Sequence, residues 1–134
     1  RHGDCGQVTL LFVTLCRIAG IPAHFQSGFM MQPRAWNLHD WAEVYFEGIG
    51  WVPVDQSFGL APYAEKAGKP YFYLGGIDSW RMVVNQDYGM PLVPEKKYPR
   101  SETVDFQRGE VEWAGGNLYF TEWDYHMDIE YLNY

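Results

Sequence analysis

The sequence predicts an α+β domain in which one helix packs on a mostly antiparallel β-sheet. Apolar residues recur at helical spacing over residues 4–19. Strand-like composition follows in three segments, at residues 21–31, 39–46 and 51–54. The chain has 134 residues, of which 47% are hydrophobic, and this suits a single core. We therefore expect one domain over residues 1–134.

The charge balance limits the partners that this chain can bind. The formal net charge is −7 and the isoelectric point is near 4.9, so we exclude nucleic acid and favour a neutral or basic partner. No apolar run approaches the roughly 18 residues of a membrane span, and we expect no transmembrane segment. The chain has no signal peptide and no initiating Met, so we expect it to be a piece of a longer protein.

The first helix has clear signals at both ends. Asp4 can cap its N-terminus, and Gln7 three residues later completes a capping box. Gly20 followed by Pro22 ends it. The apolar residues expected to face the core are Val8, Leu11, Phe12, Leu15 and Ile18.

Two cysteines lie on this helix, and they cannot form a disulfide with each other. Cys5 and Cys16 are eleven residues apart, which is roughly 16 Å along a helix, whereas a disulfide needs Cα atoms within about 7 Å. Cys16 borders the apolar residues, and we expect it to be a small core residue.

Cys5 has a different environment, at the first helical position. Unpaired backbone N–H groups and the positive end of the helix dipole favour a thiolate there and should lower the pKa of the thiol. Gly3 and Gly6 leave room beside it for a substrate carbonyl. Taken alone, this pattern also fits an ordinary thiol with no chemical role.

A β-hairpin carries the candidate partners of Cys5. His39 begins its first strand and Asp55 ends its second, with the turn at residues 47–50 between them. The two side chains share a face only if opposed residue numbers sum to an even value such as 94 or 96. That register needs an odd-length loop or a bulge, for which Gly48 and Gly50 supply the backbone freedom. In the preceding segment, Gly28 predicts a bulge or a close approach of backbones.

The second half of the chain contains no motif that we can assign. We expect irregular structure over residues 89–101, where three prolines fall. Further strands are predicted at residues 71–74, 80–85, 103–113 and 118–129, the last running along a sheet edge.

Metal binding is a weaker alternative for the cysteine. His2 and Cys5 have a His-x-x-Cys spacing, but no second Cys/His pair at ligand spacing accompanies them. We therefore predict no metal and no cofactor. Trp36, before His39, is expected either to form an apolar wall for the substrate, which we favour, or to cover the core. Trp41 is expected to pack in the core or to shield His39, and we count it with Trp36 among the residues near the substrate.

These segments together resemble the transglutaminase-like superfamily of cysteine enzymes, which has a papain-like fold. The resemblance lies in four stretches of sequence: Gly3-Asp4-Cys5, Leu15-Cys16-Arg17-Ile18-Ala19-Gly20-Ile21-Pro22-Ala23, His39-Asp40-Trp41-Ala42-Glu43-Val44-Tyr45 and Gly50-Trp51-Val52-Pro53-Val54-Asp55. It implies that Cys5 is the nucleophile, that His39 is the base and that Asp55 orients His39. It also implies helices upstream of Cys5 with an oxyanion-hole side chain, which we expect upstream sequence or another domain to supply.

The expected function is acyl transfer on amide bonds through a thioester, of the peptidase or amidase type, with a peptide or protein as substrate. Protein-glutamine cross-linking is an alternative in which an amine replaces water. A non-catalytic module that binds a peptide or glycan is an alternative of another class. The resemblance favours an extracytoplasmic location.

Overall fold

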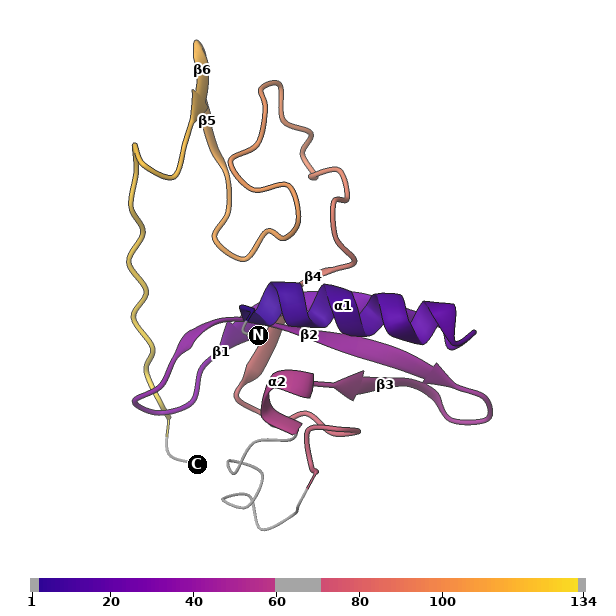
Figure 1. The fold of residues 1–134 in the computed structure, drawn as a ribbon. Coiled ribbons are helices and arrows are strands. Elements are labelled where there is room, and N and C mark those ends of the chain that lie inside the picture. The colour runs from indigo at the N-terminus through magenta and orange to yellow at the C-terminus, as the bar shows by residue number, and fades with distance from the viewer. Residues whose placement is uncertain (1–2, 60–70, 133–134) are drawn as a thin grey trace.

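The structure is a computed structural model, and it describes residues 3–59 and 71–132. Its main sheet has four antiparallel strands in the order β3-β2-β1-β4, and α1 lies along this sheet (Figure 1). A separate two-stranded hairpin, β5-β6, stands apart from it. The elements are α1 (Cys5–Ile18), β1 (Ala23–Met30), β2 (Asn37–Phe46), β3 (Gly50–Val54), α2 (Gln56–Gly59), β4 (Arg81–Gln86), β5 (Val111–Trp113) and β6 (Gly116–Leu118). The α+β class is thereby confirmed.

Helix α1 begins at Cys5 through the predicted capping box. The Asp4 carboxylate accepts a hydrogen bond from the Gln7 backbone N–H at 2.8 Å, and the Gln7 side chain accepts one from the Asp4 N–H at 3.3 Å. At the other end Gly20 has φ of 78°, a left-handed conformation that a glycine adopts without strain.

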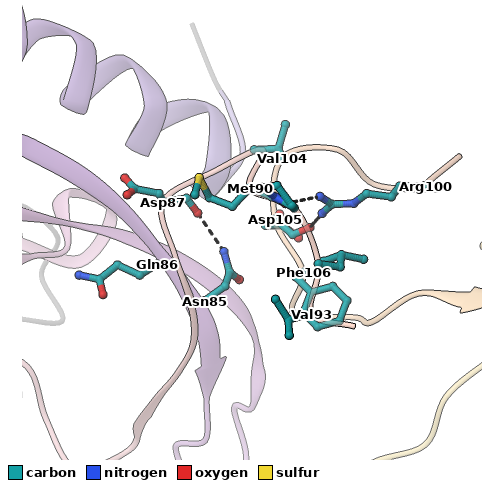
Figure 2. A pocket seen from close by; sticks show the side chains of 11 residues that line it. Asn85, Gln86, Asp87, Met90, Val93, Arg100, Val104, Asp105 and Phe106 are labelled. Carbon is teal, nitrogen blue, oxygen red and sulfur yellow. Dashed lines mark hydrogen bonds between the residues drawn. The ribbon is translucent and has the colours of Figure 1, made fainter. Parts of the chain in front are cut away.

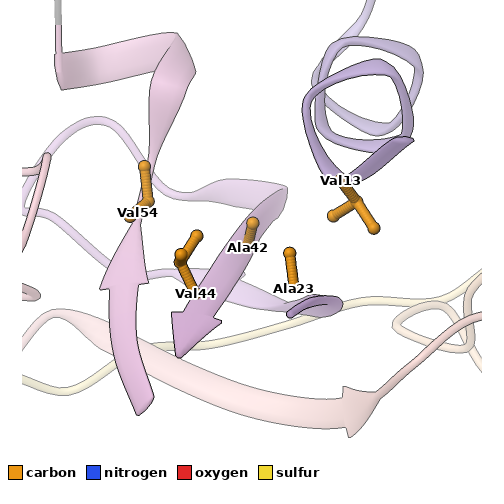
Figure 3. Close-up of a cluster of buried hydrophobic side chains, with 5 residues drawn as sticks. All are labelled: Val13, Ala23, Ala42, Val44 and Val54. Atoms are coloured by element: carbon orange, nitrogen blue, oxygen red, sulfur yellow. The ribbon is translucent and has the colours of Figure 1, made fainter. Parts of the chain in front are cut away.

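The core lies between α1 and the sheet. Its buried members are Val13, Ala23, Ala42, Val44 and Val54 (Figure 3). Phe12 and Cys16 pack against them, which confirms the expectation for Cys16.

The predicted apolar face of α1 was partly wrong. Leu11, Leu15 and Ile18 are 60%, 55% and 78% exposed. The buried face is instead set by Thr9 and Val13, one turn apart. The Thr9 hydroxyl hydrogen-bonds the side-chain amide of Gln56, and this bond lets a polar residue occupy the buried face.

The hairpin β2-β3 has the even register that a shared face requires. Ala42 pairs with Val54 and Phe46 pairs with Gly50, so paired residue numbers add up to 96. The loop between Phe46 and Gly50 holds three residues, and Gly48 and Gly50 have φ of 79° and 105°. Glycine thus supplies the conformations that the odd-length loop demands.

Strand β4 pairs with β1 on the side away from β2, and Gly28 makes this possible. The register of β1 and β4 shifts between Ser27 and Gly28, so the predicted bulge is present. A Cβ on Gly28 would lie 1.9 Å from the Met82 carbonyl oxygen. The two backbones approach so closely here that only glycine fits.

Most strands predicted for the second half of the chain were wrong. Residues 71–74 form a turn with one isolated bridge, between Val54 and Leu74. Residues 103–113 and 118–129 contain only the short β5 and the end of β6. Side chains take up backbone groups that a sheet would use: the Glu110 carboxylate accepts from the N–H groups of Ser101 and Glu102, and Arg100 donates to the Asp105 carbonyl. The irregular structure expected at 89–101 is confirmed.

Within the described ranges, none of the helices has the length and apolar character needed to cross a bilayer.

Candidate active site

His39 and Asp55 form a buried pair at the end of the hairpin. His39 Nε2 lies 2.7 Å from Asp55 Oδ2, and their side chains are 7% and 6% exposed. The other carboxylate oxygen, Oδ1, accepts from the backbone N–H groups of Ser57 and Phe58 at 3.1 and 3.2 Å. Asp55 is therefore held by the first turn of α2 on one side and presents Oδ2 to the imidazole on the other.

Arg81 is a third member of this buried group, and the sequence analysis did not predict it. Its Nη2 lies 3.0 Å from Asp55 Oδ2, and its side chain is 1% exposed. The contact is an ion pair rather than a directed hydrogen bond, because its angles do not meet hydrogen-bond geometry. A lone arginine opening a short strand carries no motif, and only the pairing of β4 with β1 brings it to the hairpin.

Cys5 lies against Asp40, the residue that follows the expected base. Cys5 Sγ donates to Asp40 Oδ2 at 3.1 Å. Burial, and then the charge and hydrogen bond of Asp40, raise the pKa of Cys5 to about 12. Backbone N–H groups of Asp40 and Gly6 act in the opposite direction and are outweighed. The expected lowering of this pKa by the helix start was therefore wrong in this arrangement, because burial and the neighbouring carboxylate both favour the protonated thiol.

Gly6 permits the close approach of the helix to Asp40. A Cβ on Gly6 would lie 3.1 Å from Asp40 Oδ2, so the space beside Cys5 that was expected to receive a substrate carbonyl holds this carboxylate. Gly3, the other glycine expected there, precedes the helix and is exposed.

Gln107 holds Asp40 from the far side. Its Nε2 donates to Asp40 Oδ1 at 2.6 Å and to the His39 carbonyl oxygen at 2.8 Å. Burial raises the pKa of Asp40. Burial, followed by the charges of Asp40 and Glu102, raises the pKa of Asp105 to about 6. The thiol thus contacts one carboxylate, Asp40, and a second carboxylate, Asp105, interacts electrostatically with Asp40.

No hydrogen bond joins Cys5 to His39 within residues 3–59 and 71–132. Side chains alternate along β2, so Asp40 and Ala42 face α1 while His39 and Trp41 project from the opposite face. Of the three residues expected to form a triad, the structure brings together His39 and Asp55. Cys5 has Asp40 as its partner instead.

The tryptophans expected near the site differ in exposure. Trp36 is 45% exposed in the connection before β2. Trp41 is 1% exposed, its ring centroid lies 6.0 Å from that of His39, and its Nε1 donates to Gln26 Oε1 at 2.7 Å. Trp41 therefore shields the imidazole from solvent, as one of its two expected roles required.

Comparison with protein families gives one match. Residues 1–56 match the model of the transglutaminase-like superfamily. The match covers all four stretches of the resemblance, including the three that carry Cys5, His39 and Asp55, and it confirms the resemblance over those residues. This superfamily comprises cysteine-dependent enzymes. Comparisons with curated proteins and with solved structures gave no match.

Arg81, Asp105 and Gln107 lie beyond the transglutaminase-like match. A cavity of about 250 Å³ opens between the end of β4 and this later part of the chain, and Asp105 and Asp87 are among its lining residues (Figure 2). Asp105 interacts electrostatically with Asp40, but Cys5, His39 and Asp40 are not among the residues that line this cavity.

A metal centre was not expected from the sequence. His2, which has the spacing of a ligand with Cys5, lies outside the described residues. Among the residues that are described, no group of three or more His, Cys, Asp or Glu side chains has the arrangement of a metal site.

Proposed function

We propose that this chain catalyses cysteine-dependent acyl transfer on amide bonds, as a peptidase or amidase with a papain-like arrangement. Cys5 is the nucleophile, His39 the base and Asp55 the residue that orients His39. The observation that carries the proposal is the buried hydrogen bond of 2.7 Å between His39 and Asp55, contributed by opposite ends of one hairpin within the matched residues. The helix-start position of Cys5 supports the same assignment.

The His39–Asp55 hydrogen bond uses one imidazole nitrogen and leaves the other to act as the base. With Nε2 bonded to the carboxylate, Nδ1 is free to accept the thiol proton, and the resulting imidazolium is stabilised by Asp55. The thiolate then attacks the amide carbonyl and forms a tetrahedral intermediate. Collapse of this intermediate breaks the C–N bond, the imidazolium returns the proton to the leaving amine, and a thioester remains on Cys5. Water attacks this thioester, with His39 again as the base, and releases the acid.

The reaction starts from a thiol that is hydrogen-bonded to Asp40. Because burial and that carboxylate raise the pKa of Cys5, and because Cys5 and His39 lie on opposite faces of β2, the first step in this proposal is a rearrangement of α1 against the start of β2 that breaks the Cys5–Asp40 hydrogen bond and brings the thiol to His39 Nδ1. Substrate binding at the thiol would displace this hydrogen bond and so couple ionisation of Cys5 to the presence of substrate.

An amine can replace water as the acceptor. Protein-glutamine transamidation is then the outcome, and the acidic groups around the thiol favour the approach of a cationic amine. The balance between the two acceptors is measured by adding an amine to the same assay.

A peptide- or glycan-binding module without catalysis is the second candidate. The observation that favours it is the pairing of Cys5 with Asp40 instead of His39, which keeps the thiol protonated at neutral pH. The two candidates differ in whether Cys5 forms a covalent adduct with an amide substrate.

The test is a panel of peptide amides incubated with the chain, with and without added amine, and followed by mass spectrometry. Cys16→Ala is a matched control, since Cys16 is a thiol on the same helix that packs against the core. We expect turnover in the wild type and in Cys16→Ala, and a loss of at least about 10³-fold in Cys5→Ala. Equal turnover in the wild type and Cys5→Ala would contradict the proposal.

A further inference from the structure

Arg81 is a charged side chain enclosed in the centre of the molecule. Its guanidinium carbon lies over three aromatic rings, at 4.9 Å from the centroid of Phe58, 5.2 Å from Tyr73 and 5.7 Å from Trp41. Aromatic faces attract a cation but accept no strong hydrogen bond. Burying a charge in such a site is costly unless an opposite charge accompanies it.

Asp55 is the carboxylate that compensates this charge. Its Oδ2 lies 3.0 Å from Nη2 of Arg81, and the same oxygen lies 2.7 Å from His39 Nε2. A second carboxylate, Asp78, lies farther away, with Oδ1 at 3.9 Å from Arg81 Nε, and is occupied by the Tyr73 hydroxyl at 2.6 Å. One carboxylate oxygen thus joins the arginine to the imidazole.

We propose that Arg81 is a positioning residue for the reaction, acting on His39 through Asp55. The guanidinium holds the Asp55 carboxylate in place toward Nε2, so that this nitrogen carries the imidazole proton and Nδ1 stays free as the base. The inference rests on the proposed function for its consequence in catalysis. It extends the working site beyond the matched residues 1–56, to strand β4.

The charge on His39 depends on groups from every element around it. Asp55 faces it after β3, Arg81 from β4, and Asp40 adjoins it on β2. Asp78 and Tyr73 contact Arg81 from the connection before β4, and Cys5 on α1 is bonded to Asp40. Removing Arg81 alone therefore leaves the charge of Asp55 unbalanced and makes the ring bind a proton more readily.

The experiment compares Arg81→Met, which fills the aromatic cage without a charge, with Arg81→Lys, which keeps the charge. Arg17→Gln is the control, because Arg17 is an arginine whose Nε donates to the Ala23 carbonyl away from the site. The readouts are the pH midpoint of the His39 ring signals in nuclear magnetic resonance, and kcat and KM on the amide substrate. The ring signals are assigned with His39→Gln.

We expect Arg81→Met to raise the His39 midpoint by about one pH unit and to lower kcat at least about tenfold, with little change in KM. Arg81→Lys should keep the midpoint within about 0.3 pH unit, as should the control. A folded Arg81→Met variant with the wild-type midpoint would overturn the inference, because a packing role alone leaves the midpoint unchanged.

Two outcomes separate this inference from the proposed function. If the wild type turns over no amide, the proposed function fails, and the midpoint difference still decides the role of Arg81. If Arg81→Met does not fold, Arg81→Lys decides: an unchanged midpoint with reduced kcat supports the inference, and a midpoint raised by about one pH unit despite the retained charge overturns it.

Discussion

The buried charges on the two sides of β2 differ in whether an opposite charge lies beside them. On one side His39, Asp55 and Arg81 combine a base, an acid and a cation, and the buried negative charge is balanced by the positive one. On the other side Cys5 meets Asp40, with Asp105 close behind, and no cation contacts the thiol among the described residues. In the proposed reaction the first side serves proton transfer. On the second side the thiol is hydrogen-bonded to Asp40, so in that reaction substrate binding has to promote the ionisation of Cys5.

Gly28→Ala should have the largest effect of these substitutions, on the side of β2 that holds His39, Asp55 and Arg81. Its Cβ would lie 1.9 Å from the Met82 carbonyl oxygen, so β4 must move and carry Arg81 away from Asp55. We expect a loss of roughly 3 kcal/mol in the free energy of unfolding, measured by urea denaturation. Gly20→Ala is the control: it has a positive φ but nothing within 4 Å, and should cost only about 1 kcal/mol. Equal losses in the two variants would show that β4 is not packed as described.

Gln107→Leu tests how much the hydrogen bonds of Gln107 stabilise the side of β2 that contacts Cys5. Gln107 donates to both Asp40 Oδ1 and the His39 carbonyl, and leucine leaves these buried acceptors without that donor. Since each unsatisfied buried group is costly, we expect a loss of about 2 kcal/mol in thermal or urea unfolding. A wild-type stability in this variant would mean that residues 105–107 do not pack on β2.

Asp40→Asn should lower the pKa of Cys5 and make its thiol more reactive. The substitution removes the charge that, after burial, contributes most to raising the pKa of Cys5 to about 12. We expect alkylation of Cys5 by iodoacetamide at pH 8 to accelerate about tenfold or more, as measured by peptide mass spectrometry. Asp128→Asn makes the same change in net charge at an exposed site and should leave the rate unchanged. An unchanged rate in Asp40→Asn would show that Asp40 does not restrain the thiol.

Asp105→Asn should have the smallest effect, and one that depends on pH. The pKa of Asp105 is raised from 3.8 to about 6 in the folded chain, so folding favours its protonated form. Stability from this preference is present in full below pH 3.8 and is lost as pH rises through 6. The substitution Asp105→Asn should therefore stabilise the chain at pH 7.5 by about 1 kcal/mol, a value reduced for solvent screening, and should have no effect at pH 3.5. A gain of the same size at both pH values would contradict the assignment.

The sequence predicts the fold of the matched residues 1–56 well because its signals there are local. The capping box of Asp4 and Gln7 defines the start of α1, and the glycines at positions 48 and 50 define an odd-length loop. That loop alone sets the even register that brings His39 to Asp55. These inferences needed only the spacing of neighbouring residues.

The features that escaped prediction depend on contacts between distant segments. Arg81 reaches Asp55 only through the pairing of β4 with β1, and Gln107 reaches Asp40 from a segment without regular structure. In the expected strand at 103–113, the Val104 N–H donates to the Glu102 carboxylate and the Asp105 carbonyl accepts from Arg100, so nearby side chains satisfy these backbone groups in place of a neighbouring strand. Asp40 went unnoticed as the partner of Cys5, although its place next to His39 on a strand puts it on the face that meets α1.

The central claim is that Cys5 and His39 act together although Cys5, on α1, lies at one face of β2 and the His39 side chain projects from the other face. It is tested most directly by trapping the thioester: the chain is mixed with an activated peptide ester at pH 7.5, quenched in acid within seconds and mapped by mass spectrometry. The account predicts an acyl group on Cys5 in the wild type and none on Cys16, with the yield on Cys5 lost in His39→Ala. Acylation of Cys5 that proceeds equally well in His39→Ala, or no acylation of Cys5 in the wild type, would contradict it.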